Sequence, residues 1–156
     1  MAKAMKPQLD AIVLDKDVVR ESLFADRVDY SNTQNDLCIE IIYKVAHYLM
    51  TGVSPPVVIL DGRTYSKRYQ VDALIDFAQG VPSRLKIIEC VCSEQTARER
   101  LALDEGMHLA KDRDFKLYLA SKSASEPITV PRLTLDTGKN DLPECVQQAL
   151  QYVSSP

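Results

Sequence analysis

The sequence predicts an α/β protein built on a mainly parallel sheet, and three observations support this fold class. Short apolar runs alternate with helical patterns along the whole chain. The first two of these runs are continuously apolar, as in strands that are covered on both faces. The chain has 156 residues, of which 46% are hydrophobic and 26% charged, an ordinary globular composition. We therefore expect a single domain over residues 1–156.

Four apolar runs are the expected strands, and they cover residues 11–14, 57–60, 85–91 and 133–135. A stripe of apolar residues at helical spacing between 37 and 49 predicts a helix between the first two strands. Ser66 and Ser93 are the expected N-caps of the next two helices. In the last helix, Asp141 and Glu144 stand at capping-box spacing.

Residues 104–131 differ from the rest of the chain because they are polar and mixed in charge. Two interpretations remain open for this segment. It is either a solvated helix and loop, or a flexible flap that covers a cleft.

Composition and charge exclude several classes of protein. No apolar run is as long as the roughly 18–20 residues that span a bilayer, and residues 1–10 lack the apolar core of a signal peptide. The formal net charge of −3 gives no reason to expect bulk nucleic acid as a partner. Four cysteines without an export signal indicate reduced thiols. We therefore expect a cytoplasmic protein that binds neither membranes nor bulk nucleic acid.

Carboxylates follow three of the four expected strands, and such positions form the ligand crevice of an open α/β sheet. Asp15 and Asp17 follow the first strand, Asp61 the second and Asp136 the fourth. Grouped carboxylates suit Mg²⁺, and one of them can act as the general base for a hydroxyl. For Asp136 we favour an ordinary turn, whereas Asp15, Asp17 and Asp61 together favour a functional site.

Two arginines accompany these carboxylates. Arg20 lies one helical turn beyond Asp17, and Arg63 lies just after Asp61. A guanidinium at this edge suits a phosphoryl or carboxylate group, although each arginine could instead pair with a neighbouring aspartate. Both interpretations stay open for Arg20.

The glycines limit what the chain can bind. All five stand singly, so neither GxxxxGK[ST] nor GxGxxG occurs in the sequence. The two histidines and the Cys90–Cys92 pair have no convincing metal-ligand spacing, and no Ser–His–Asp set can be assembled.

The order of these segments resembles the P-loop kinase-like proteins. The segments that carry the resemblance are AIVLDKDVVRESLF, VVILDGRTYSKRYQ, IIECVCSEQTARERL, the DRD flap and LTLDTGKND. Among such proteins the chain looks most like the small phosphotransferases near polynucleotide kinase, chloramphenicol phosphotransferase, shikimate kinase and gluconate kinase. The resemblance implies a three-layer sandwich, with Mg²⁺ and ATP as cofactors and a small molecule or nucleotide as acceptor.

The resemblance also implies roles for individual residues. Asp17 matches the position that contacts the acceptor and acts as the general base for it. Asp15 matches a position near Mg²⁺ or substrate. Asp61 matches the strand end that carries the Walker B-like carboxylate, with Arg63 toward the acceptor. Arg113 matches a lid arginine, and Arg100 is a weaker candidate for the same role. Thr137 and Gly138 match the region that borders the adenine.

Such proteins begin with a strand and a Walker A loop, whereas residues 1–10 resemble the second half of the helix that follows. We favour a truncated gene product, with a natural remnant as the alternative. Either way we expect this chain to have lost most of its ATP affinity and its activity, because the phosphate loop supplies much of the charge neutralisation. Loss of a central strand also leaves unpaired sheet edges, which predicts an aberrant sheet, poor solubility or a homodimer across the gap.

Two other functions compete with the phosphotransferase. VLDKDVV also fits the start of the haloacid-dehalogenase-like phosphatases, in which Asp15 would be the nucleophile and Asp17 the acid/base. The third hypothesis is a non-catalytic kinase-like protein that binds a ligand in the same crevice.

Overall fold

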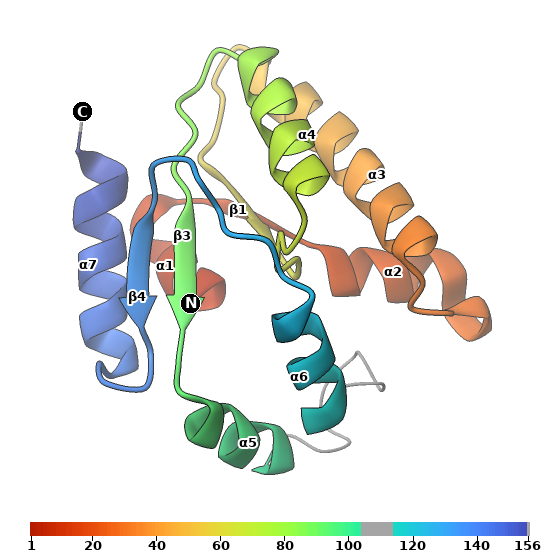
Figure 1. Ribbon diagram of the computed structural model, residues 1–156. Coiled ribbons are helices and arrows are strands. Elements are labelled where there is room, and N and C mark those ends of the chain that lie inside the picture. The colour runs from red at the N-terminus through yellow and green to blue at the C-terminus, as the bar shows by residue number, and fades with distance from the viewer. Residues whose placement is uncertain (104–113, 156) are drawn as a thin grey trace.

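The computed structural model describes residues 1–103 and 114–155, and strands alternate with helices along the chain (Figure 1). The strands are β1 (Ile12–Asp15), β2 (Val58–Asp61), β3 (Ile88–Val91) and β4 (Leu133–Asp136). The helices are α1 (Ala2–Leu9), α2 (Lys16–Phe24), α3 (Asn32–Met50), α4 (Arg68–Gln79), α5 (Glu94–Leu103), α6 (Phe115–Ser123) and α7 (Leu142–Ser154), with a 3₁₀ turn η1 (Ala25–Arg27) after α2.

All strand pairing in the described residues is parallel, as the sequence predicts, but the strands form two separate sheets. β1 pairs with β2 in a register that runs from Ile12 opposite Val58 to Asp15 opposite Asp61. β3 pairs with β4 in the same way. Among the described residues, each of these sheets has two strands.

The helix starts follow local capping chemistry. Asp141 and Glu144 form the predicted capping box of α7, and the Ser93 hydroxyl accepts a hydrogen bond from the Thr96 N–H at 3.1 Å. The prediction for Ser66 is wrong by one residue, because α4 begins after Lys67, whose main-chain N–H donates to the Gln70 side chain at 3.2 Å.

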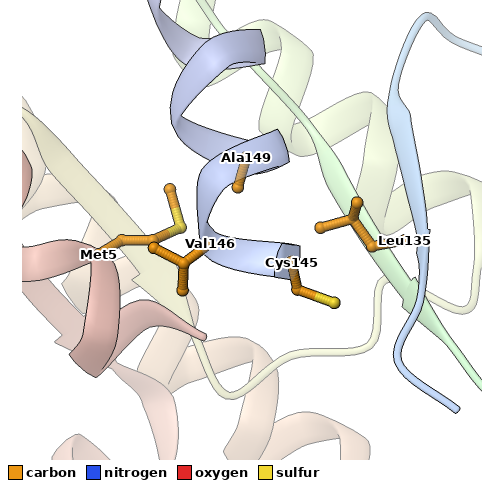
Figure 2. Close-up of a cluster of buried hydrophobic side chains, with 5 residues drawn as sticks. All are labelled: Met5, Leu135, Cys145, Val146 and Ala149. Carbon is orange, nitrogen blue, oxygen red and sulfur yellow. The ribbon is translucent and has the colours of Figure 1, made fainter. Parts of the chain in front are cut away.

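One hydrophobic cluster joins α1, β4 and α7. Figure 2 shows Met5 of α1 facing Val146 of α7, with Leu135 of β4 beside Cys145 and Ala149. Because α1 also contacts β1 and β2, this short helix connects the two sheets. The contact depends on burial of apolar side chains, which contributes about 25 cal/mol per Å² of buried apolar surface.

A second helical pair packs through aromatic rings. Tyr43 of α3 stacks on Phe77 of α4, with ring centroids 4.6 Å apart, and the two helices lie side by side in Figure 1. Among the described residues, no helix combines the length and the hydropathy that a bilayer-spanning segment needs.

Candidate functional site

The carboxyl ends of β1 and β2 bring Asp15 and Asp61 together, because these two residues are paired in the parallel register. Asp15 Oδ1 accepts the Asp17 N–H at 2.9 Å, so this carboxylate also caps α2. Asp61 Oδ1 accepts the Gly62 N–H at 2.8 Å. Each of these hydrogen bonds uses one oxygen and leaves the second oxygen of that carboxylate to other ligands. The edge predicted from the sequence therefore exists.

Gly62 allows the backbone to pack directly on the Asp15 carboxylate. Its φ is +79°, in the region that side chains rarely adopt, and a Cβ atom there would lie 2.7 Å from Asp15 Oδ1 and 3.0 Å from the Lys16 nitrogen. No role was expected for this glycine from its place in the sequence. Its D-G position after a strand was the available signal, but that signal equally fits an ordinary turn.

Asp17 is held by two cations at the start of α2. Lys16 Nζ lies 3.1 Å and Arg20 Nη2 3.0 Å from the same atom, Asp17 Oδ1. Neither ion pair engages Asp17 Oδ2. The carboxylate is thus held through one of its two oxygens.

Arg20 is buried, with 1% of its surface exposed. Besides Asp17, its guanidinium donates to Asn35 Oδ1 at 2.8 Å and lies 4.5 Å from the centre of the Tyr30 ring. These partners favour the ion-pair interpretation of Arg20 over direct contact with a substrate. Arg20 positions Asp17, and Asn35 and Tyr30 were missed because they lie on the next helix and the loop before it.

Arg63 forms a second, separate pair. Its guanidinium contacts the Asp36 carboxylate of α3 and lies 5.8 Å from the centre of the Tyr65 ring. The Tyr69 hydroxyl donates to the other Asp36 oxygen at 3.0 Å. Asp36 was missed because it is 27 residues away from Arg63 and follows no strand.

Four buried polar side-chain atoms of this site make no hydrogen bond among the described residues, namely Asp17 Oδ1, Arg63 Nε, and the Nε and Nη2 atoms of Arg20. Asp17 Oδ1 and Arg20 Nη2 form the 3.0 Å ion pair with each other, so within the described residues Arg63 Nε and Arg20 Nε are the two that have neither kind of partner. Such atoms are costly in a folded protein and call for an explanation, such as a ligand or an ordered ion. Arg63 also lines a cavity of about 770 Å³, so a ligand bound in this cavity would lie beside that residue.

The two tyrosines that contact the guanidiniums have strained backbones. The φ angle is +56° at Tyr30 and +48° at Tyr65, in the left-handed region that costs a residue with a side chain about 1–3 kcal/mol. The Tyr65 and Tyr43 hydroxyl oxygens lie 3.4 Å apart. Burial is the main cause that raises the pKa of both tyrosines, so both remain neutral at physiological pH.

The carboxyl ends of β3 and β4 form a different cluster. Arg100 of α5 donates to the Thr137 hydroxyl at 2.8 Å and to the Thr137 carbonyl at 2.6 Å. Asp136 accepts the Gly138 N–H at 3.0 Å and pairs with exposed Lys139 at 3.3 Å. The Gly138 hydrogen bond is the main cause that lowers the pKa of Asp136. This geometry supports the turn interpretation of Asp136, and it places Arg100 on Thr137.

Comparison with known proteins identifies the family. A model described as an AAA domain matches residues 1–133. The chain belongs to this family. Its AAA domain is of the P-loop kinase-like class, as the resemblance of the sequence predicts. No curated protein matches the chain.

A solved structure has the same fold as this AAA domain protein. It is the crystal structure of "a putative kinase" from Chloroflexus aurantiacus, which matches with a TM-score of 0.71 and 20% sequence identity. The alignment covers 98% of this chain and 90% of that one. The predicted mainly parallel α/β fold of the kinase class is thereby confirmed.

AAA domain proteins of this class generally use ATP and Mg²⁺, and the residues present fit the two cofactors unequally. Mg²⁺ is commonly held by one or two carboxylates together with substrate phosphates, and the Asp15–Asp61 pair supplies two. Among the described residues, no group of three or more His, Cys, Asp or Glu side chains could hold a metal by itself. The 156 residues contain no glycine-rich phosphate loop, so the nucleotide phosphates have no comparable partner.

The expected flap of this AAA domain is only partly visible. Arg113, the expected lid arginine, lies outside the described residues. Residues 114–131 begin with α6, which packs against α5 through the Arg98 guanidinium, 4.2 Å from the centre of the Phe115 ring. After α6, Glu126 accepts the Arg68 N–H at 2.7 Å. This part of the segment is therefore tied to the start of α4.

Proposed function

We propose that this chain carries the metal- and acceptor-binding edge of an ATP-dependent phosphotransferase of the kinase class. The observation that carries the proposal is the pairing of Asp15 with Asp61 at the carboxyl ends of two parallel strands, with Asp17 on the first turn of the adjoining helix. Phosphoryl transfer depends on positioning and on charge neutralisation, which is what such an edge supplies.

Asp15 and Asp61 are the residues that would hold Mg²⁺, which neutralises charge on the phosphates when it is bound. Asp17 Oδ2 would accept the proton from the acceptor hydroxyl, because Lys16 and Arg20 hold the other oxygen in place. A general base must lie within about 2.6–3.2 Å of the proton donor. The fixed carboxylate limits where an acceptor can lie.

Arg63 would bind an oxygen of the acceptor through its guanidinium. The Asp36 carboxylate holds the far side of the guanidinium, and the neutral Tyr65 lies against its face. We further propose that the acceptor is a small molecule or a nucleotide, and that Arg100, Arg113, Thr137 and Gly138 contribute to the nucleotide side as the resemblance implies.

We propose that these 156 residues alone do not turn over ATP, because they offer no loop for its phosphates. The non-catalytic binding protein shares every residue of this proposal and differs only in turnover. The phosphatase alternative gains no support from the match to the AAA domain family.

Calorimetry tests the metal edge directly. We expect Mg²⁺ or Mn²⁺ to bind the wild-type chain, and to bind the Asp15→Asn and Asp61→Asn variants at least about tenfold more weakly. Substitutions around metal sites in other proteins weaken metal affinity by about this factor or more. Asp136→Asn is the matched control and should bind the metal like wild type. Equal binding by wild type and Asp15→Asn would exclude this site.

Titration with ATP in the presence of Mg²⁺ tests the nucleotide side. We expect weak binding and no release of ADP. Tight binding by this chain would refute the requirement for a glycine-rich loop, whereas the metal titration would remain valid on its own.

A further inference from the structure

Helix α3 is apolar on more than the side that faces the protein. Its buried apolar residues are Cys38, Ile39, Ile42 and Ala46. A different side of the same helix carries a second apolar set, Leu37, Ile41, Val45 and Tyr48. A helix that is apolar all round is normally buried all round. The second set therefore calls for a partner.

This second set forms one row along the helix, which we call the α3 stripe. Its members are four, four and three residues apart, which is the spacing of a single helical face. Leu37, Val45 and Tyr48 are 44%, 42% and 79% exposed, and Ile41 is half-buried. At 1.5 Å per residue the stripe is roughly 16 Å long. It is thus a continuous surface and not a set of scattered side chains.

The helices beside α3 contact it on other sides. Asn35 accepts a hydrogen bond from Arg20 of α2, and Tyr43 stacks on Phe77 of α4. At about 100° per residue, Asn35 and Tyr43 each lie more than about 100° around the helix from Ile41. Figure 1 shows α3 at the edge of the molecule, with α4 on the side toward the sheets. The α3 stripe therefore lies away from both contacts.

Two exposed charges of opposite sign flank the stripe. Glu40 and Lys44 are one helical turn apart, so they lie on the same flank. Their midpoint along the helix is Ile42. The apolar members have nearly the same midpoint, because Leu37 with Tyr48, and likewise Ile41 with Val45, are centred on residues 42–43.

A shared midpoint makes this surface complementary to itself. When two copies of a helix pack antiparallel about a twofold axis, the axis exchanges residues at equal distances from it along the helix and keeps each flank on its own side. With the axis at residues 42–43, Glu40 lies against Lys44 of the second copy. The same axis brings Leu37 against Tyr48 and Ile41 against Val45, and each contact occurs twice. One arrangement thus matches the apolar pattern and the charges together.

We propose that the α3 stripe is the contact surface of a homodimer, in which two α3 helices pack antiparallel about a twofold axis. One helix pair is a small interface, near or below the about 1,200 Å² at which stable interfaces begin, so the dimer is weak and depends on concentration. This surface is separate from the strand edges at which the sequence predicts a dimer. The proposal is also independent of the phosphotransferase function, because it uses none of the carboxylates of the candidate site.

The dimer would nevertheless support the candidate site. The helix that it covers carries Asn35 and Asp36, which hold Arg20 and Arg63. A second copy against the outer side of α3 would therefore stabilise the helix that positions both arginines.

Sedimentation velocity of the intact chain over a range of concentrations tests the proposal. We expect the wild type to change from monomer to dimer as the concentration rises. Glu40→Lys and Lys44→Glu each bring like charges together across the axis, so each variant alone should raise the Kd of the dimer about tenfold. An equimolar mixture of the two variants faces opposite charges again in both contacts and should restore the dimer. Attraction between the two residues within one helix would not be restored by mixing.

The apolar part of the stripe is tested by a matched pair of leucines. Leu37→Ser should raise the Kd at least about tenfold, because both copies lose an apolar contact. Leu117→Ser, at a residue of α6 that is 42% exposed, should dimerise like wild type, and so should the charge control Lys116→Glu. Circular dichroism shows that each variant is folded.

Three results would overturn the proposal. The first is a wild-type chain that stays monomeric at every concentration. The second is a dimer that Leu37→Ser and the two charge variants leave unchanged, which would place the contact on another surface, such as the strand edges. The third is a mixture of Glu40→Lys and Lys44→Glu that associates no better than either variant alone, which would exclude the antiparallel arrangement.

Discussion

The ends of β2 and β4 carry similar residues, Asp61-Gly62 and Asp136-Thr137-Gly138, yet the structure uses them differently. At the end of β2, the glycine has a positive φ and packs on the carboxylate of the neighbouring strand. At the end of β4, Asp136 accepts a hydrogen bond from its own turn and pairs with an exposed lysine. Asp61 faces a second carboxylate, Asp15, across its sheet, whereas Asp136 faces Val91. The comparison shows that an aspartate at a strand end gains a functional context when the facing strand end also carries a carboxylate.

The arginines of the two regions extend this contrast. Arg20 is buried against Asp17, Asn35 and Tyr30, whereas Arg100 is exposed and hydrogen-bonds Thr137. Removal of one partner from a buried ion pair leaves an uncompensated charge, but removal of an exposed group costs little.

The largest expected effect comes from Arg20→Met, which keeps most of the apolar stem and removes the charge. We expect the free energy of unfolding to fall by about 3 kcal/mol, because Asn35 would lose its charged donor and the half-buried Asp17 would keep only Lys16. Arg100→Met is the matched control and should cost less than about 1 kcal/mol. Urea unfolding followed by circular dichroism measures both, and equal losses would mean that the two regions do not differ.

A smaller loss of stability is expected from alanine substitutions at the glycines that follow β2 and β4, Gly62 and Gly138. Gly62→Ala should cost about 1–3 kcal/mol, because the residue has a positive φ and the new methyl group would lie 2.7 Å from Asp15 Oδ1. In Gly138→Ala the nearest atom would be 3.2 Å away and the φ is not positive, so the loss should be within about 0.5 kcal/mol. Thermal unfolding measures the difference, and the reverse order of stability would contradict the packing described for β2.

The smallest expected effect is the change with pH in the stability that Asp136 contributes. The pKa of Asp136 is lowered from 3.8, so its contribution to stability is present above about pH 4 and is lost as the pH falls through the lowered pKa. Asp136→Asn should therefore be slightly less stable than wild type near neutral pH, and the difference should shrink in acid. Urea midpoints at several pH values measure it, and a difference that grows toward low pH would have the wrong sign.

Much of the fold was predictable because it depends on local patterns. The apolar runs that begin at Ala11 and Val57 identified two strands, and the Asp141–Glu144 box identified the start of α7. Capping acts within a few residues, so its chemistry can be read along the chain. The predicted cap at Ser66 failed because Gln70 bonds the main chain of Lys67 instead, and only the tertiary geometry of that loop decides between the two.

The candidate site was predictable only in its carboxylates. Asp15, Asp17 and Asp61 follow strands directly, so their position at one edge is a consequence of parallel pairing. Asp36, Asn35 and the two tyrosines on the guanidiniums come from other elements and carry no comparable local signal.

The sequence by itself determined the parallel α/β pattern, the acidic edge and the absence of a glycine-rich loop within these 156 residues. The tertiary structure decided which arginine is buried, which aspartate is only a turn residue, and where the two sheets separate. Pairing of distant groups depends on packing among α2, α3 and β2, and packing is not encoded in local spacing. The same reason explains why, among the described residues, β2 pairs with β1 and β3 with β4, since a strand's partners are set by the whole sheet and not by the strand's own residues.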